Sequence, residues 1–144
     1  MIFDEDQLAL KEAADRFARE VLLPGYQKRE NQPFDRDLAR EMGALGFIGT
    51  DLPEELGGLG QTSITTGMVA EALAYGDFNM SALPVNVSLN AAVLLQHASK
   101  AIAEEWVPKM ISGDKLMAIC LTEPRGGSDA ARIELRARKR GRDY

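Results

Sequence analysis

A short loop in the last quarter of the sequence gathers residue types suited to holding a ligand through backbone amides and hydroxyls. It reads Leu121-Thr122-Glu123-Pro124-Arg125-Gly126-Gly127-Ser128-Asp129. Glycine lets backbone N–H groups approach an anion closely, and the Thr and Ser hydroxyls add donors. The chemistry suits a ligand rich in phosphate or carbonyl oxygen. Taken alone, however, the loop is better interpreted as a plain β-turn, because turn residues occur in every protein.

Helices must position this loop, because helical periodicity dominates the sequence before it. The spacing of apolar residues and the end signals predict helices over residues 6–23, 35–45, 62–75, 81–98 and 99–107. Pro24-Gly25 should stop the first helix, and Pro108 should bend or end the last one. The glycine-rich stretch 46–60 should be an ordered loop, anchored by its apolar side chains.

The spacing of apolar residues stops being helical at Leu116. Residues 116–121 form a continuous apolar run that predicts a buried strand, with Cys120 as an inert buried thiol, and residues 133–138 alternate as a half-exposed strand does. The fold class is therefore mainly α, with an all-helical domain over residues 1–115 and the truncated start of a β-domain over 116–144. Two strands alone are marginal in water, so we expect that a C-terminal part is missing.

Composition excludes several classes of protein. The 144 residues are 45% hydrophobic with a net charge of −5, which argues for a packed domain and against nucleic acid as a partner. The basic tail alternates along a predicted strand without interleaved aromatics, so we interpret it as a solvated face. The acidic N-terminus is not a signal peptide, and no apolar run looks long enough to span a bilayer. One cysteine favours a cytoplasmic or other reducing compartment.

No metal or catalytic residue is predicted. His97 is the only histidine, and near a helix end it is expected to cap or pack, since no partner nucleophile is visible. No ligand cluster indicates a metal site.

Four landmarks, in order and spacing, resemble the acyl-CoA dehydrogenase family over nearly the whole chain. They are Gly46-Phe47-Ile48-Gly49 with Pro53-Glu54-Glu55-Leu56-Gly57-Gly58-Leu59-Gly60; Gly76-Asp77 before an Asn- and Ser-rich helix; Trp106-Val107-Pro108-Lys109-Met110 with Ser112-Gly113-Asp114; and Leu121-Thr122-Glu123-Pro124 with Gly127-Ser128-Asp129.

The resemblance implies a helical N-terminal domain of up-and-down type, a middle β-domain and a C-terminal helical domain, with FAD between the last two. It implies α,β-dehydrogenation of an acyl-CoA thioester to the enoyl-CoA, with electrons passing to FAD and then to an electron-transfer flavoprotein. The full-length protein would be a homotetramer. The family's catalytic base is a carboxylate of the C-terminal domain, so this chain alone should be inactive.

The resemblance also implies site residues. Ile119, Leu121, Thr122, Gly127 and Ser128 would face FAD. Ser128 would also lie near the CoA arm. For the acyl chain, Val85 and Leu89 are the candidates, with Val93 on the same helix.

Departures from the family leave the acyl group open. Ile119 stands where many relatives carry an aromatic residue, Leu56 stands where tyrosine is common, and Arg125-Gly126 replaces two small residues. The alternative function is a catalytically dead helical binding or assembly module derived from the same family.

Overall fold

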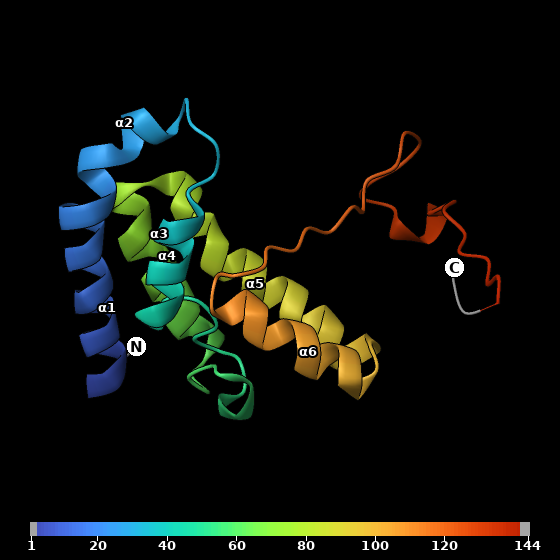
Figure 1. Cartoon of the computed structure of the whole chain (residues 1–144), viewed down its shortest axis with the longest axis horizontal. Helices are drawn as coiled ribbons and strands as arrows, with labels where there is room; N and C mark the ends of the chain where they lie inside the picture. Colours follow the sequence, from blue (N-terminus) through green and yellow to red (C-terminus); the bar gives the residue numbers. More distant parts are fainter. Residues whose placement is uncertain (1–2, 142–144) are drawn as a thin grey trace.

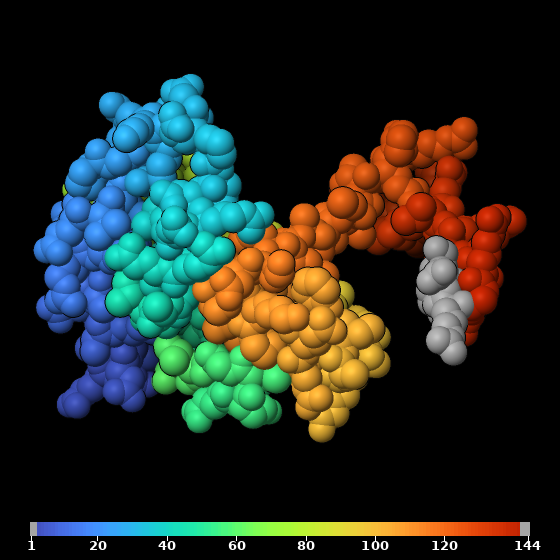
Figure 2. Space-filling view, in the orientation of Figure 1, coloured from blue at the N-terminus to red at the C-terminus, as the bar shows by residue number. Residues whose placement is uncertain are grey.

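The computed structural model describes residues 3–141 and is mainly helical (Figure 1). Helix α4 packs against α1 and α5, and α5 packs in turn against α6. The chain after α6 leaves the bundle and extends away from it (Figure 2). The expected mainly α fold is confirmed. The helices are α1 (Glu5–Phe17), α2 (Tyr26–Arg29), α3 (Arg36–Ala44), α4 (Ser63–Gly76), α5 (Phe78–His97) and α6 (Lys100–Ile111).

Helix α1 begins at a capping box. The Asp4 carboxylate accepts a hydrogen bond from the Gln7 backbone at 2.8 Å, and the Gln7 side chain accepts one from the Asp4 backbone at 3.2 Å. The helical path does not stop at Pro24, as the sequence predicted. It continues through a π-helical turn (Ala18–Leu22) and a 3-10 turn (Leu23–Gly25) into α2. The winding changes next to Pro24, which has no N–H to donate.

Helix α3 is capped by Asp35, as predicted, through a 3.0 Å bond from the Leu38 backbone. The glycine-rich loop that follows is ordered, as expected, with Phe47, Ile48 and Leu52 buried. It folds back on itself, since the Gln61 N–H donates to the Thr50 carbonyl at 2.8 Å.

The glycines of this loop are needed for two different reasons. Gly49 adopts a φ of 77°, a conformation that side chains rarely tolerate. A Cβ on Gly58 would lie 2.2 Å from the Leu52 carbonyl oxygen.

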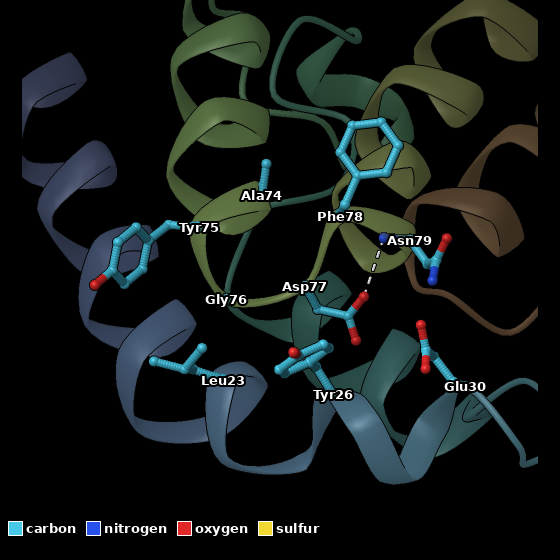
Figure 3. Close-up of a pocket in the computed structure, with 9 residues that line it drawn as sticks. All are labelled: Leu23, Tyr26, Glu30, Ala74, Tyr75, Gly76, Asp77, Phe78 and Asn79. Carbon is cyan, nitrogen blue, oxygen red and sulfur yellow. Dashed lines mark hydrogen bonds between the residues drawn. The ribbon is translucent and has the colours of Figure 1, made fainter.

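Helices α4 and α5 meet at Gly76-Asp77. A Cβ on Gly76 would lie 2.3 Å from the Ala18 carbonyl oxygen, so glycine is what lets α4 abut the end of the first helix. Asp77 caps α5 by accepting from the Asn79 N–H at 3.0 Å (Figure 3) and from the Met80 N–H at 3.3 Å. Because of this cap α5 begins at Phe78, three residues before the start that the sequence predicted.

Helix α6 is capped by Ser99, as predicted, but it runs through Pro108 to Ile111. Pro108 cannot donate to the carbonyl of Glu104, four residues earlier. Glu104 lies on the exposed face of α6, so water can bond that carbonyl and the helix continues.

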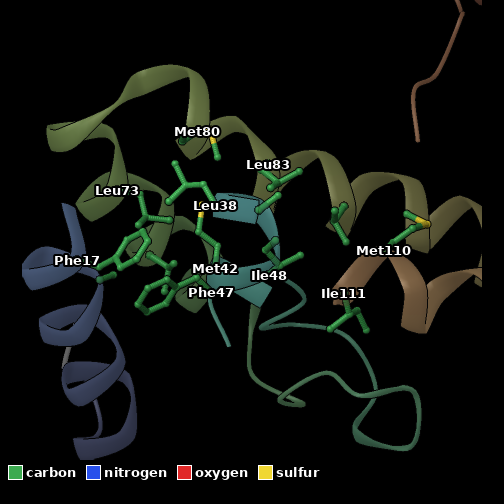
Figure 4. Close-up of a cluster of buried hydrophobic side chains, with 14 of the residues drawn as sticks. Phe17, Leu38, Met42, Phe47, Ile48, Leu73, Met80, Leu83, Met110 and Ile111 are labelled. Carbon is green, nitrogen blue, oxygen red and sulfur yellow. The ribbon is translucent and has the colours of Figure 1, made fainter. Parts of the chain in front are cut away.

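One hydrophobic core joins the bundle (Figure 4). Phe17 of α1 meets Phe47 of the glycine-rich loop edge to face, with ring centroids 5.5 Å apart. The largest side chains with almost no exposed surface come from α3, α4, α5, α6, the π-helical turn after α1 and that loop, and include Leu22, Met42, Phe47, Ile48, Leu73, Val87, Val107 and Met110.

The two predicted strands do not form within residues 3–141. Residues 116–122 and 133–138 have no regular secondary structure, and the one β-bridge whose partners are described joins Glu123 and Gly126. Cys120 is exposed rather than buried. The physical reason is that a strand needs a neighbouring strand to pair its backbone groups, and this segment has none there.

We predict that Asp77→Ala lowers the free energy of unfolding by about 3 kcal/mol, because it removes a cap and leaves a half-buried cation without its partner. The Arg29 Nε lies 2.8 Å from the Asp77 carboxylate, whose side chain is 5% exposed. Asp77→Asn, which keeps the capping oxygen, should cost less. Urea denaturation measures both variants.

The matched control is Glu104→Ala, which removes an exposed ion pair with Lys100 at 3.6 Å. It should change the free energy of unfolding by less than about 0.5 kcal/mol. Equal losses for Asp77→Ala and Glu104→Ala would contradict the role given to Asp77.

Candidate functional site

The candidate loop is carried by an arm that begins where α6 ends. The Lys115 N–H donates to the Lys109 carbonyl at 2.9 Å and turns the chain away from the helix. Asp114 pairs with Arg40 of α3 at 2.8 Å. This hydrogen bond holds the pKa of Asp114 below its ordinary value. The ion pair therefore stabilises the folded chain fully above the pKa that Asp114 has in the unfolded chain. This stabilisation is lost as the pH falls through the lower pKa of Asp114 in the folded chain.

A second contact joins the arm to α5. The Asn90 side-chain amide donates to the Met117 carbonyl at 3.5 Å and to the Asn86 carbonyl at 2.7 Å. Asn90 is fully buried, and its Oδ1 finds no partner among the described residues. Sequence reasoning missed this residue, because an Asn on a helix gives no signal until the chain that crosses it is known.

The loop itself is a tight turn. The Glu123 N–H donates to the Gly126 carbonyl at 2.9 Å, and the Gly126 N–H returns a bond of 3.1 Å. The turn brings Gly127 against Thr122, so that a Cβ on Gly127 would lie 3.2 Å from the Thr122 Cγ2 and 3.3 Å from its Oγ1. Thr122 and Gly127, two of the residues predicted to face the flavin, are therefore adjacent in space.

The polar groups of the loop remain available to a ligand. Its hydrogen bonds engage the side chain and backbone of Glu123, the backbone of Gly126, the Arg125 side chain and the Asp129 carbonyl. Within residues 3–141 they leave the hydroxyls of Thr122 and Ser128 unengaged. Both residues are exposed. A set of free hydroxyls and a glycine backbone fits the carbonyl edge and the phosphates of a flavin nucleotide.

The apolar candidates on the arm are exposed as well. The exposed fraction is 41% for Ile119 and 51% for Leu121. The backbone and side chain of Leu121 are therefore accessible to a ligand or a neighbouring segment. The burial that the sequence predicted for this run is absent in the described chain.

The acyl-chain candidates lie on a different element, α5. Val85 and Leu89 are one turn apart, with exposed fractions of 51% and 56%, and Val93 continues the stripe at 39%. The opposite face of the same helix is buried through Leu83, Val87 and Ala91. An apolar stripe left open beside a packed face is typical of a helix that has a further partner or ligand.

By length and composition alone, helix α5 is also long and apolar enough to cross a membrane. Its packing gives another reason for its apolar character. It lies between α4 and α6 and buries Asn90, so it is a core helix of the bundle.

Clefts lie on the helical bundle, outside the candidate loop. One of about 520 Å³ lies between α2 and the α4–α5 junction and is bordered by Leu23, Tyr26, Tyr75 and Phe78 (Figure 3). Another of about 270 Å³ is almost wholly apolar and lies between α5, α6 and Leu116-Met117.

His97 is exposed at the end of α5. Residues 3–141 hold no cluster of side chains fit for a metal ion.

Residues 4–114 match the family described as "Acyl-CoA dehydrogenase, N-terminal domain". The chain belongs to the acyl-CoA dehydrogenase family. The members of this family are flavoproteins of acyl-CoA and fatty-acid metabolism. The match spans all six helices and ends at Asp114, where the arm begins.

Individual acyl-CoA dehydrogenases agree with this assignment. Mitochondrial isobutyryl-CoA dehydrogenase of Dictyostelium discoideum is 32% identical over 141 residues, which cover 97% of this chain and 34% of the relative. The solved structure of a glutaryl-CoA dehydrogenase from Mycobacterium smegmatis in complex with FADH2 superposes with a TM-score of 0.86 at 28% identity, over 96% of this chain and 36% of that one.

Butyryl-CoA dehydrogenase from Megasphaera elsdenii superposes with a TM-score of 0.80 at 28% identity, over 91% of this chain and 36% of that one. The chain thus spans about a third of the length of these three relatives.

Gly127→Ala should displace the Thr122 side chain, because the added Cβ would meet its methyl and hydroxyl at 3.2 and 3.3 Å. The shift of the Thr122 methyl resonance in NMR spectra of the chain measures this displacement. Gly126→Ala is the matched control, since its Cβ would find nothing nearer than the Asp129 carbonyl at 3.9 Å. Equal shifts in the two variants would show that Thr122 and Gly127 are not in contact.

Proposed function

We propose that this chain is the N-terminal part of a flavin-dependent acyl-CoA dehydrogenase that converts an acyl-CoA thioester to the enoyl-CoA. The observation that carries the proposal is the family match over residues 4–114, followed along the chain by an exposed loop whose Thr122 and Ser128 hydroxyls make no hydrogen bond within residues 3–141. The same family supports acyl-CoA as the substrate, an electron-transfer flavoprotein as the electron acceptor and a homotetramer as the assembly.

The loop residues would hold the flavin, which supplies the two-electron oxidation when bound. The Leu121 backbone and the Thr122 hydroxyl would donate to the pyrimidine edge of the ring system. A fixed donor there stabilises the negative charge of the reduced form, and a hydrogen bond to a charged acceptor contributes about 1.5–3 kcal/mol. Gly127 and Ser128 would offer donors to phosphate oxygens.

The open stripe of α5 would form one wall of the acyl-chain pocket. Val85 and Leu89 are aliphatic and exposed, and burying such side chains against a hydrocarbon chain is favourable by about 25 cal/mol per Å². The outer parts of the site, and the carboxylate that removes the α-proton, would come from outside the 144 residues.

We further propose that residues 116–144 begin the β-domain of the enzyme. The described part of this segment lacks the neighbouring strands that would pair it, and the relatives are about three times as long. Pairing in the longer protein would bury Cys120 and Leu121. A reducing compartment, such as the cytoplasm, suits a cysteine that has no second cysteine to pair with in these 144 residues.

The 144-residue chain, purified alone, should be helical by circular dichroism, colourless, and without activity on any acyl-CoA. The reason is that it carries one wall of the flavin site and no catalytic base. Absorbance near the flavin bands measures bound flavin, and a dye-reduction assay measures activity on acyl-CoA. Tight retention of FAD by the chain alone would contradict this division of the site.

The intact mass of the protein in its native host decides between this proposal and a helical module without catalysis. A mass about three times that of this chain supports the enzyme, because the relatives have that length. A native mass of 15.8 kDa would favour the module.

In the full-length protein, Thr122→Ala should weaken FAD binding about tenfold or more and lower the reduction potential of the flavin, because one donor to the reduced ring is lost. FAD titration and redox titration measure the two effects. Thr122→Ser, which keeps the hydroxyl, is the control and should behave nearly as the wild type. Unchanged flavin affinity and potential in Thr122→Ala would remove Thr122 from the site.

A further inference from the structure

Glu123 holds the candidate loop closed with its side chain as well as its backbone. One carboxylate oxygen, Oε2, accepts from the Glu134 N–H at 2.8 Å, and the other, Oε1, accepts from the Leu135 N–H at 2.9 Å. Both distances are those of good N–H···O bonds to an ionised group. Glu123 is half-buried, whereas its two partners are exposed.

These bonds join two points of the chain that no strand pairing joins. The stretch between Glu123 and Glu134 contains Gly127, Ser128 and a short 3-10 turn (Ala130–Arg132). Within residues 3–141 the only other link across its base is an exposed ion pair between Arg125 and Glu134 at 3.5 Å. An exposed pair of this kind contributes little to stability. The carboxylate of Glu123 therefore sets the shape of the loop.

We propose that Glu123 is the positioning residue of the flavin loop: its carboxylate fixes the hydroxyls of Thr122 and Ser128 in one mutual arrangement, ready for the ligand. This inference rests on the proposed function. Glu123 follows Thr122 directly, so the position at which its carboxylate holds the chain limits where the threonine hydroxyl can lie. Ser128 lies inside the closed loop and depends on the same closure.

The chemistry requires a carboxylate at this position. Two consecutive backbone N–H groups face the side chain, so both of its terminal atoms must be acceptors. In Glu123→Gln, one of those atoms becomes an NH₂ group that points its hydrogens at an N–H. The substitution preserves size and shape and removes one of the two bonds, which makes it a stricter test than alanine.

A solvated surface glutamate is the competing explanation. Its carboxylate would exchange partners with water and would not select two neighbouring amides. The two explanations differ in the protection of those amides, which is measurable on the chain as it stands, without any flavin.

The first experiment follows solvent exchange of the Glu134 and Leu135 amide protons by NMR in the wild-type chain and in Glu123→Gln. Loss of a charge-assisted bond should speed exchange of at least one of these amides about tenfold, with an upfield shift of its proton resonance. Glu134→Gln is the control, because it removes only the ion pair with Arg125. Equal exchange rates in wild type and Glu123→Gln would overturn the proposal.

The second experiment uses the flavin-loaded full-length protein. Glu123→Gln should weaken FAD binding about tenfold and change the absorption spectrum of the bound flavin, and Glu123→Asp should restore part of both. Glu134→Gln should leave both unchanged. Faster amide exchange with unaltered flavin affinity and spectrum would leave Glu123 a purely structural residue and overturn the positioning role.

Flavin binding by the wild-type protein distinguishes a failure of the role given to Glu123 from a failure of the proposed function. A full-length wild type that holds no flavin would refute the proposed function, and the role of Glu123 toward a flavin with it. A wild type that holds flavin, beside a Glu123→Gln variant that also holds it unchanged, would refute the role of Glu123 alone.

Discussion

The turn between α4 and α5 is the constraint on which the rest of the structure depends. Gly76 lets α4 approach the end of the first helical segment, since a Cβ there would meet the Ala18 carbonyl oxygen at 2.3 Å. Asp77 then ends one helix, begins the next and holds Arg29. One buried carboxylate thus fixes three helical segments relative to one another. Its charge is tolerated because it is both paired and hydrogen-bonded.

The direction that this turn gives to α5 decides what the domain presents to its surroundings. Val87 and Ala91 turn inward against the core, and Val85 and Leu89 remain outside. The same helix therefore supports the bundle with one face and offers an apolar wall with the other. Asn90 and Met117 attach the arm to this helix, so a change in the rotation of α5 would also move the start of the candidate loop.

The candidate site was only partly predictable from sequence. The adjacency of Thr122 and Gly127 follows from turn chemistry over a short separation, which sequence spacing carries. The clamp by Glu123 on Glu134 and Leu135 was not predicted, because it depends on the chain returning after a second turn. The exposure of Leu121 was missed for a related reason, since burial of a strand is a property of its neighbours.

The sequence by itself determined the five longer helices and two of their four side-chain caps, because capping by Asp35 and Ser99 and breaking by Gly76 act within a few residues. Only the tertiary structure decided how prolines are tolerated, which face of α5 stays open, and whether the apolar run after α6 is a strand. Helical hydrogen bonds close within one turn of the chain, whereas burial and strand pairing need partners that are distant in sequence.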